Sequence, residues 1–225
     1  MSYKIEYDQI DAAARILYVK RDPADKFAFP LIANTHGSLS VILADAGNIP
    51  AEVDNSTHTL QTIEYEHHEI HSGSHYFIGR ASSLALSAVI DVQVQTANTT
   101  KWPHLTFQLQ CAAETAWWIY ENVSFTLTGS TLTPYNNNRN SANTSGTICY
   151  QIANASVALA NADTNITGST LLIQGVIGDG REGGQDERSK ELILKQNTKY
   201  LFRAESLSAG QVGYNIEWYE HTDKD

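Results

Sequence analysis

The sequence predicts an all-β protein, most of which folds as a jelly-roll-like antiparallel β-sandwich. Residues 84–94 alternate apolar and polar side chains without a break, which is the pattern of a half-buried strand. The same period of two recurs in residues 105–111 and 212–218. Helical periodicity is almost absent beyond residue 65, so the apolar faces of these strands have to pack against one another in two sheets.

Residues 1–65 differ in sequence pattern from the rest of the chain. They are expected to form an extended arm or a small, mostly irregular subdomain that attaches the protein to a partner. Prolines interrupt this segment. Asp8 is a candidate N-cap for a short helix that continues through Leu17, although residues 15–20 are equally compatible with a strand. Residues 37–46 offer one further short strand.

The second predicted domain, residues 66–225, consists of short strands separated by turns rich in Gly, Asn, Pro and Ser. Long connections that cross between two sheets favour a jelly roll over an up-and-down barrel. No repeat of fixed period is visible, which argues against a propeller. The expected strands are residues 76–79, 84–95, 105–111, 117–120, 123–128, 147–152, 169–177, 192–194, 199–204 and 212–219.

Composition excludes several classes of function. The chain has 225 residues, is 42% hydrophobic and carries a formal net charge of −10. A surface with this charge does not attract phosphates, so we expect no nucleic-acid partner. No apolar run reaches the roughly 18 residues of a membrane-spanning helix, and the first residues lack the apolar core of a signal peptide. We therefore expect no membrane association and synthesis in the cytoplasm of the host cell.

The densest group of possible metal ligands lies in the run HHEIHSGSH, which begins at residue 67. On an extended strand His67, Glu69 and His71 would share one face, and two imidazoles with a carboxylate can hold a divalent metal. Cupin-type sites instead need a downstream Glu and a second, distant His in an arrangement that this sequence does not offer. We therefore predict no metal here and expect a structural or contact role for these histidines.

Signals for catalysis are weak. The chain contains no nucleophile elbow GxSxG, no phosphate-binding GxxxxGK, no HExxH and no GxGxxG between a strand and a helix. Glu114 and Glu121 are conceivable as the carboxylate pair of a glycosidase, but such pairs are frequent by chance. We predict neither an enzyme nor a cofactor. Aromatic side chains that could stack on sugars are Trp117, Trp118, Tyr120 and Tyr135, although adjacent tryptophans of one strand point to opposite faces.

Five motifs in order resemble a group of structural proteins of tailed bacteriophages, which we identify as head decoration or cement proteins. The similarity covers residues 66–222. The motifs are HHEIHSGSHYFIG, DVQVQTANTTKWPHL, LTPYNNNRNSANT, LILKQNTKYLF and NIEWYEHT. The resemblance implies a virion protein that binds the major capsid protein on the outer surface of the shell, stabilises the shell, and forms a homotrimer at local three-fold positions.

Under this interpretation the arm and two long loops make the contacts. Residues 1–65 would reach over the shell, the loop at residues 134–146 would hold an Asn-rich turn around Arg139, and residues 178–191 would bridge subunits through Arg181, Glu187 and Arg188. Two alternatives remain open at this point. One is a receptor- or glycan-binding module of the tail or fibre, and the other is a cupin-like metal-dependent enzyme.

Overall fold

The computed structural model describes residues 65–126, 129–178, 181–185 and 191–222, together with the strand backbone at residues 5–8, 16–19, 29–33 and 39–40. The chain divides into two units, Met1–Thr62 and Ile63–Asp225. No helix in the described part of the chain is long and apolar enough to cross a membrane.

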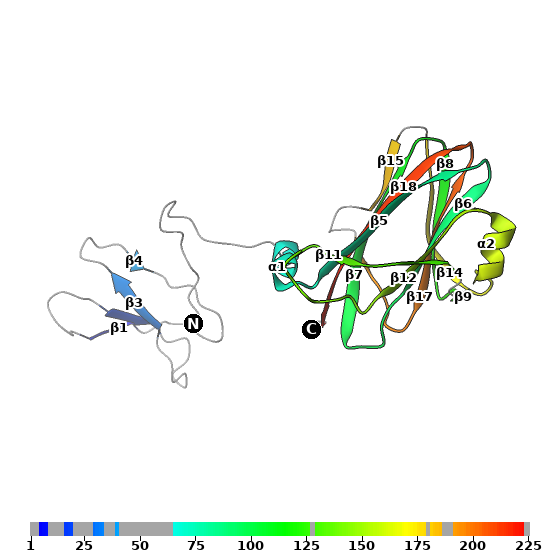
Figure 1. The fold of residues 1–225 in the computed structure, drawn as a ribbon. Coiled ribbons are helices and arrows are strands. Elements are labelled where there is room, and N and C mark those ends of the chain that lie inside the picture. Colours follow the sequence, from blue (N-terminus) through cyan, green and yellow to red (C-terminus); the bar gives the residue numbers. More distant parts are fainter. Residues whose placement is uncertain are drawn as a thin grey trace. The chain divides into compact units, whose positions relative to one another are not determined.

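The first unit contains a four-stranded antiparallel sheet (Figure 1). Its strands follow one another in chain order: β1 (Ile5–Asp8), β2 (Ile16–Val19), β3 (Phe29–Ala33) and β4 (Leu39–Ser40). The helix that the sequence allowed after Asp8 is therefore wrong where it can be checked, because Asp8 ends a strand and Leu17 lies in one. Of the two alternatives for residues 15–20, the strand is confirmed.

The second unit is an all-β sandwich, as predicted, and its strand order is that of a jelly roll (Figure 1). The first of eight strands pairs with the last, the second with the seventh, the third with the sixth and the fourth with the fifth. One sheet has the order β5-β18-β7-β15 and the other β6-β17-β8-β14. In chain order the eight are β5 (His75–Leu84), β6 (Ala88–Gln95), β7 (Lys101–Cys111), β8 (Thr115–Glu121), β14 (Thr170–Ile177), β15 (Arg181–Gln185), β17 (Lys199–Ser206) and β18 (Gly210–Thr222).

Additional elements widen both sheets and cover their outer sides. Strand β12 (Ile148–Ser156) pairs with β6 and β10 (Ser130–Leu132) pairs with β12, while β11 (Tyr135–Asn136) pairs with β5 and β16 (Leu192–Ile193) with β7. A small sheet joins β9 (Ser124–Phe125) to β13 (Thr164–Asn165). Two helices complete the unit, α1 (Tyr65–Ser72) and α2 (Val157–Asp163), and Figure 1 shows them on opposite sides of the sandwich.

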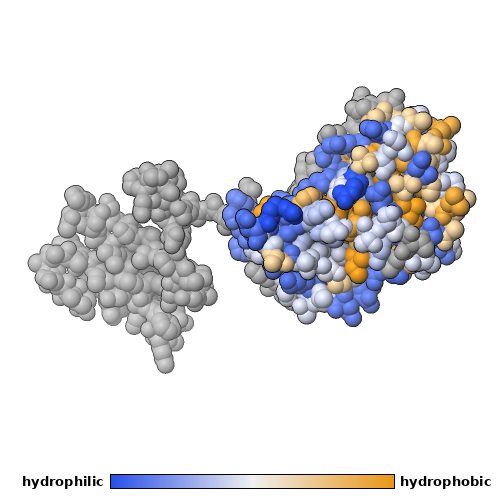
Figure 2. Space-filling model, in the orientation of Figure 1, coloured by the Kyte–Doolittle hydropathy of each residue, from blue (hydrophilic) through white to orange (hydrophobic). Residues whose placement is uncertain are grey.

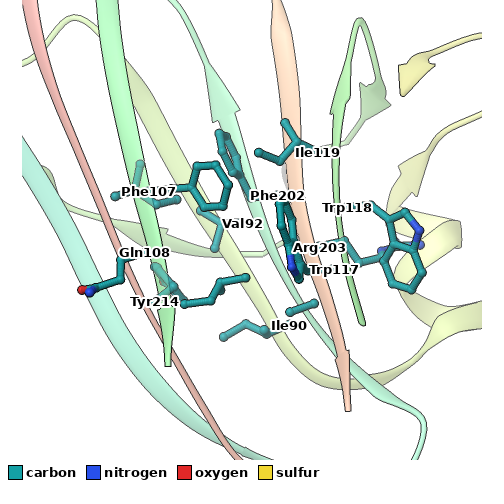
Figure 3. Close-up of a pocket in the computed structure, with 13 residues that line it drawn as sticks. Ile90, Val92, Phe107, Gln108, Trp117, Trp118, Ile119, Phe202, Arg203 and Tyr214 are labelled. Carbon is teal, nitrogen blue, oxygen red and sulfur yellow. The ribbon is translucent and has the colours of Figure 1, made fainter. Parts of the chain in front are cut away.

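The hydrophobic core lies between the two sheets, where alternate residues of each strand point inward. Trp218, Ile216 and Leu105 contribute from one sheet, and Ile119 and Tyr200 from the other; all five are almost fully buried. Figure 3 shows Phe107, Phe202 and Trp117 in the same interior. The only two cysteines of the chain, Cys111 and Cys149, are buried free thiols in strands.

The ten predicted strand regions all contain strands, but the prediction of one half-buried strand over residues 84–94 is wrong. Leu84 ends β5, and a turn follows in which Ser87 has a φ of 57° and Leu86 is 65% exposed. Strand β6 then begins at Ala88 and is buried on both faces. By coincidence the turn residues continue the alternation of apolar and polar side chains, so the sequence pattern did not reveal the turn between β5 and β6.

Candidate interaction surfaces

Strand β14 is an edge strand of the sandwich that carries several exposed apolar side chains. It ends a six-stranded sheet, pairs with β8 on one side, and has no partner among the described strands on the other. Leu171, Leu172 and Val176 on this strand are 38–62% exposed. An exposed apolar edge strand is a surface on which another polypeptide can pack or pair.

The inner side of β14 makes room for a tryptophan of the neighbouring strand β8. Gly175 is the cross-strand neighbour of Trp117, and the indole of Trp117 fills the place of the missing side chain. A Cβ at residue 175 would lie 2.8 Å from the indole Nε1 atom. The glycine therefore allows Trp117 to pack against the core while the side chain of Val176 faces outward.

A buried ion pair lies on the outer side of the same sheet. The Arg203 guanidinium donates to both oxygens of Asp91 at 2.7 and 2.6 Å and to Asn161 Oδ1 at 2.6 Å. Asp91 is fully buried and Arg203 nearly so. Burial raises the pKa of the Asp91 carboxyl, and the guanidinium opposes this rise. Sequence reasoning missed the pair, although each residue interrupts an apolar strand and could have signalled it.

The Asn-rich loop that follows β11 is fixed at both of its ends. At one end Asn136 donates to the carbonyl of Gly73, which ends α1, at 2.8 Å. At the other end the buried Glu220 accepts hydrogen bonds from Ser145 Oγ, the backbone amides of Gly146 and Thr147, and Thr147 Oγ1. Trp218 Nε1 also donates to Glu220, at 3.0 Å. Both ends of this loop are therefore hydrogen-bonded to other elements of the second unit.

Arg139 lies at the turn of this loop, as the sequence suggested. The amide of Ser141 donates to the carbonyl of Asn138 at 2.9 Å and closes the turn. The Arg139 guanidinium carbon lies 5.3 Å from the centre of the Tyr135 ring. Both side chains are exposed, so they form a stacked cationic and aromatic pair at the surface. Whether this pair contacts a partner stays a prediction.

The histidine cluster is helical, so the extended conformation in which His67, Glu69 and His71 would share one face is not present. Residues 65–72 form α1, and Gly73 with a φ of 74° ends the helix. His67 and His71 lie four residues apart on one exposed side, with their Nε2 atoms 3.1 Å apart. Glu69 is buried and accepts a hydrogen bond from Ser74, so the predicted three-residue face of His67, Glu69 and His71 does not form.

The outer side of the β5-β18-β7 sheet carries a row of stacked rings. Tyr219 pairs with His75 on one neighbouring strand and with His104 on the other. The ring centres of His104 and Tyr219 are 4.7 Å apart, and those of His104 and His221 are 4.4 Å apart. Glu191 accepts a hydrogen bond from Tyr219 OH at 2.8 Å and lies 2.8 Å from His104 Nδ1. No local sequence pattern indicates this row, because its members come from segments that are distant in the sequence.

The carboxylates considered for glycoside hydrolysis lie at opposite ends of β8. A strand of this length separates Glu114 from Glu121 by roughly 20 Å, whereas glycosidase pairs are about 5–9.5 Å apart. Glu121 accepts hydrogen bonds from Lys195 Nζ at 2.6 Å and Tyr200 OH at 2.9 Å. Burial alone would raise the pKa of Glu121, but these two hydrogen bonds bring it below its usual value.

The two adjacent tryptophans face opposite sides of β8, as the strand geometry predicted. Figure 3 shows Trp117 in the interior and Trp118 pointing away from it. The interior there holds a cavity of only about 20 Å³, lined mainly by core residues, which has room for one water molecule. This cavity is too small for a sugar or another organic ligand.

Arg181, Glu187 and Arg188 are the three remaining residues for which contacts between subunits were predicted. Glu187 and Arg188 lie outside the described residues, and of Arg181 only the backbone is described, at the start of β15.

Comparison of the chain with known protein families, with curated proteins and with solved structures found no match.

Proposed function

We propose that this protein is a head decoration protein of a tailed bacteriophage. It binds the major capsid protein on the outer surface of the shell and stabilises the shell, and it catalyses no reaction. Support comes from the similarity of residues 66–222 to that group. The observation that carries the proposal is the apolar edge of β14, because such an edge is suited to burial against protein.

The β14 edge fits contacts between copies of the chain. A head-to-tail contact, in which β14 of one copy packs on a different flank of the next, closes into a ring when the rotation is a third of a turn. We therefore propose a homotrimer at local three-fold positions of the shell. On the face in view in Figure 2, hydrophilic residues predominate around α1, and hydrophobic residues are more frequent toward the end of the sandwich away from α1.

Stabilisation of the shell would follow from mass action. A protein that binds only the expanded shell lowers its free energy by RT ln(1 + [L]/Kd) per site, which is about 2.7 kcal/mol when the free concentration is 100 times Kd. The formal net charge of −10 suits a position on the outside of the shell, away from the packaged genome.

Two measurements test the proposal with the full-length chain. Sedimentation equilibrium should give three times the mass of one chain, and the protein should co-sediment with expanded heads that lack it. Val176→Lys places a charge on the apolar edge and should yield a monomer. Leu86→Lys is the matched control, because Leu86 is 65% and Val176 62% exposed and Leu86 lies in a turn away from β14; it should stay trimeric.

A monomeric wild-type chain that does not bind heads would overturn the proposal. A trimer that is unaffected by Val176→Lys would instead exclude β14 as the contact between copies. Co-sedimentation with heads would then be the measurement that tests the proposed function. Binding to glycans with localisation to the tail would favour the receptor-binding alternative.

A further inference from the structure

We infer that Glu66, His75 and Glu217 form a binding site for a divalent transition-metal ion of the zinc class, which ties α1 to the sheet. The three side chains come from three elements: α1, the start of β5, and β18. One possible ligand atom from each lies within 4.8 Å of the other two. This set differs from the three residues that the sequence suggested and goes beyond the function proposed above.

The backbone brings these ligands together. In the register of β5 and β18, His75 is opposite Tyr219 and Glu217 is opposite Phe77, so His75 and Glu217 are diagonal neighbours on one face. Helix α1 supplies Glu66, whose Oε1 lies 3.5 Å from His75 Nε2. Two ligands of a tetrahedral zinc ion with bonds of about 2.1 Å are about 3.4 Å apart, so this pair already has the spacing of a site.

Neighbouring amides orient two of the three ligands, as in protein metal sites. Asn137 Nδ2 lies 2.7 Å from His75 Nδ1, and Asn215 Nδ2 donates to Glu217 Oε1 at 2.5 Å. With the Asn137 amide in this orientation, Nδ1 accepts a hydrogen bond and Nε2 carries the imidazole proton. Rotation of the amide by 180° presents Oδ1 to an Nδ1–H group instead. The proton then resides on Nδ1, and the Nε2 lone pair is available to a metal.

The ligand types select the class of metal. Calcium and magnesium prefer sites built entirely from oxygen, whereas an imidazole with two carboxylates suits zinc and similar ions. His75 is fully buried, while Glu66 and Glu217 are partly exposed, so the ion would have access to a water molecule as a fourth ligand.

The test has to separate this site from the exposed His67 and His71 pair, which is itself able to chelate zinc. All measurements therefore use the full-length chain with His67→Ala and His71→Ala, freed of metal with a chelator. Calorimetric titration with ZnCl₂ should then give one ion per chain. Cobalt(II) in place of zinc should show the visible absorption bands of a tetrahedral site.

Glu217→Gln in this background should weaken zinc binding at least tenfold. Glu205→Gln, which changes a partly buried glutamate of strand β17 outside the cluster, is the matched control and should bind as the background does. Asn137→Asp retains only the acceptor that the metal-bound imidazole needs and should bind at least as tightly. Near-ultraviolet circular dichroism confirms that each variant is folded.

Crystals grown with zinc should show an anomalous peak between Glu66, His75 and Glu217. Loss of all zinc binding on removal of His67 and His71, or equal affinity of Glu217→Gln and Glu205→Gln, would overturn the inference.

Discussion

The buried pair of Asp91 and Arg203 gives the most quantitative prediction. Arg203→Met removes the guanidinium and leaves a fully buried carboxylate without its cation. Breaking a buried ion pair by removing one partner costs about 3–5 kcal/mol. For a domain of this size each kcal/mol corresponds to roughly 2–4 °C, so the melting temperature of the sandwich should fall by about 6–20 °C.

The companion variant separates the pair from the packing around it. Asp91→Leu together with Arg203→Met replaces both charges with apolar groups, and such replacements are often neutral or stabilising. The double variant should therefore be more stable than Arg203→Met alone. Asn161, which also accepts from Arg203, is exposed and can bond to water instead.

Tryptophan fluorescence during urea unfolding is the suitable assay. The four tryptophans, at residues 102, 117, 118 and 218, all lie in the sandwich unit, so the signal reports this unit rather than residues 1–62. A loss below about 1 kcal/mol in Arg203→Met, or a double variant that is no more stable than Arg203→Met alone, would refute the reasoning.

Three further predictions concern packing, pH and attachment. Gly175→Ala should destabilise the sandwich by about 1–3 kcal/mol, because the new Cβ meets the Trp117 indole. Gly213→Ala is the control and should be close to neutral, because a Cβ at residue 213 would lie 3.7 Å from its nearest atom. Equal effects of the two variants in urea unfolding would contradict this prediction. Because the folded pKa of Glu121 is lowered, its contribution to stability is present above the unfolded pKa of about 4.3 and is lost as the pH falls through the folded value. Between about pH 6 and pH 3, the wild-type protein should therefore lose more stability than Glu121→Gln. The difference between the two losses should be at most about 1 kcal/mol, because Lys195 is largely exposed and its ion pair with Glu121 is screened by water. Deletion of residues 2–50 should leave the tryptophan unfolding transition intact and abolish binding to heads, and full retention of binding would contradict the proposed role of the arm.

Local patterns in the sequence were sufficient for the fold class. Period-two alternation located β7 and β18, and turn residues located the connections. Outside the strands, Gly73 was a local signal that could have indicated α1, because glycine is common directly after the last residue of a helix. In the first unit the sequence offered strands at residues 15–20 and 37–46, where β2 and β4 lie, but it did not indicate β1 and β3 or the pairing of the four strands in one sheet.

Strand order and sites could not be predicted, because both depend on pairings between distant segments. Nothing local to Glu66 indicates that Glu217 will lie beside His75. Nor does the sequence near Asp91 reveal Arg203 as its partner, although each charge in an apolar strand signals that some partner exists. A residue-by-residue reading therefore finds the charged positions but cannot join them into pairs.

The place of β18 in the sandwich has a consequence for synthesis. This last strand is inserted between β5 and β7, the first and third strands of the sandwich, and does not lie at an edge. During synthesis, the backbone edges of both neighbours that face β18 stay unpaired until residues 210–222 have been added and have paired with them. Deleting residues 210–222 would thus remove the middle of a sheet, and a chaperone that shields unpaired strands would raise the yield of folded protein.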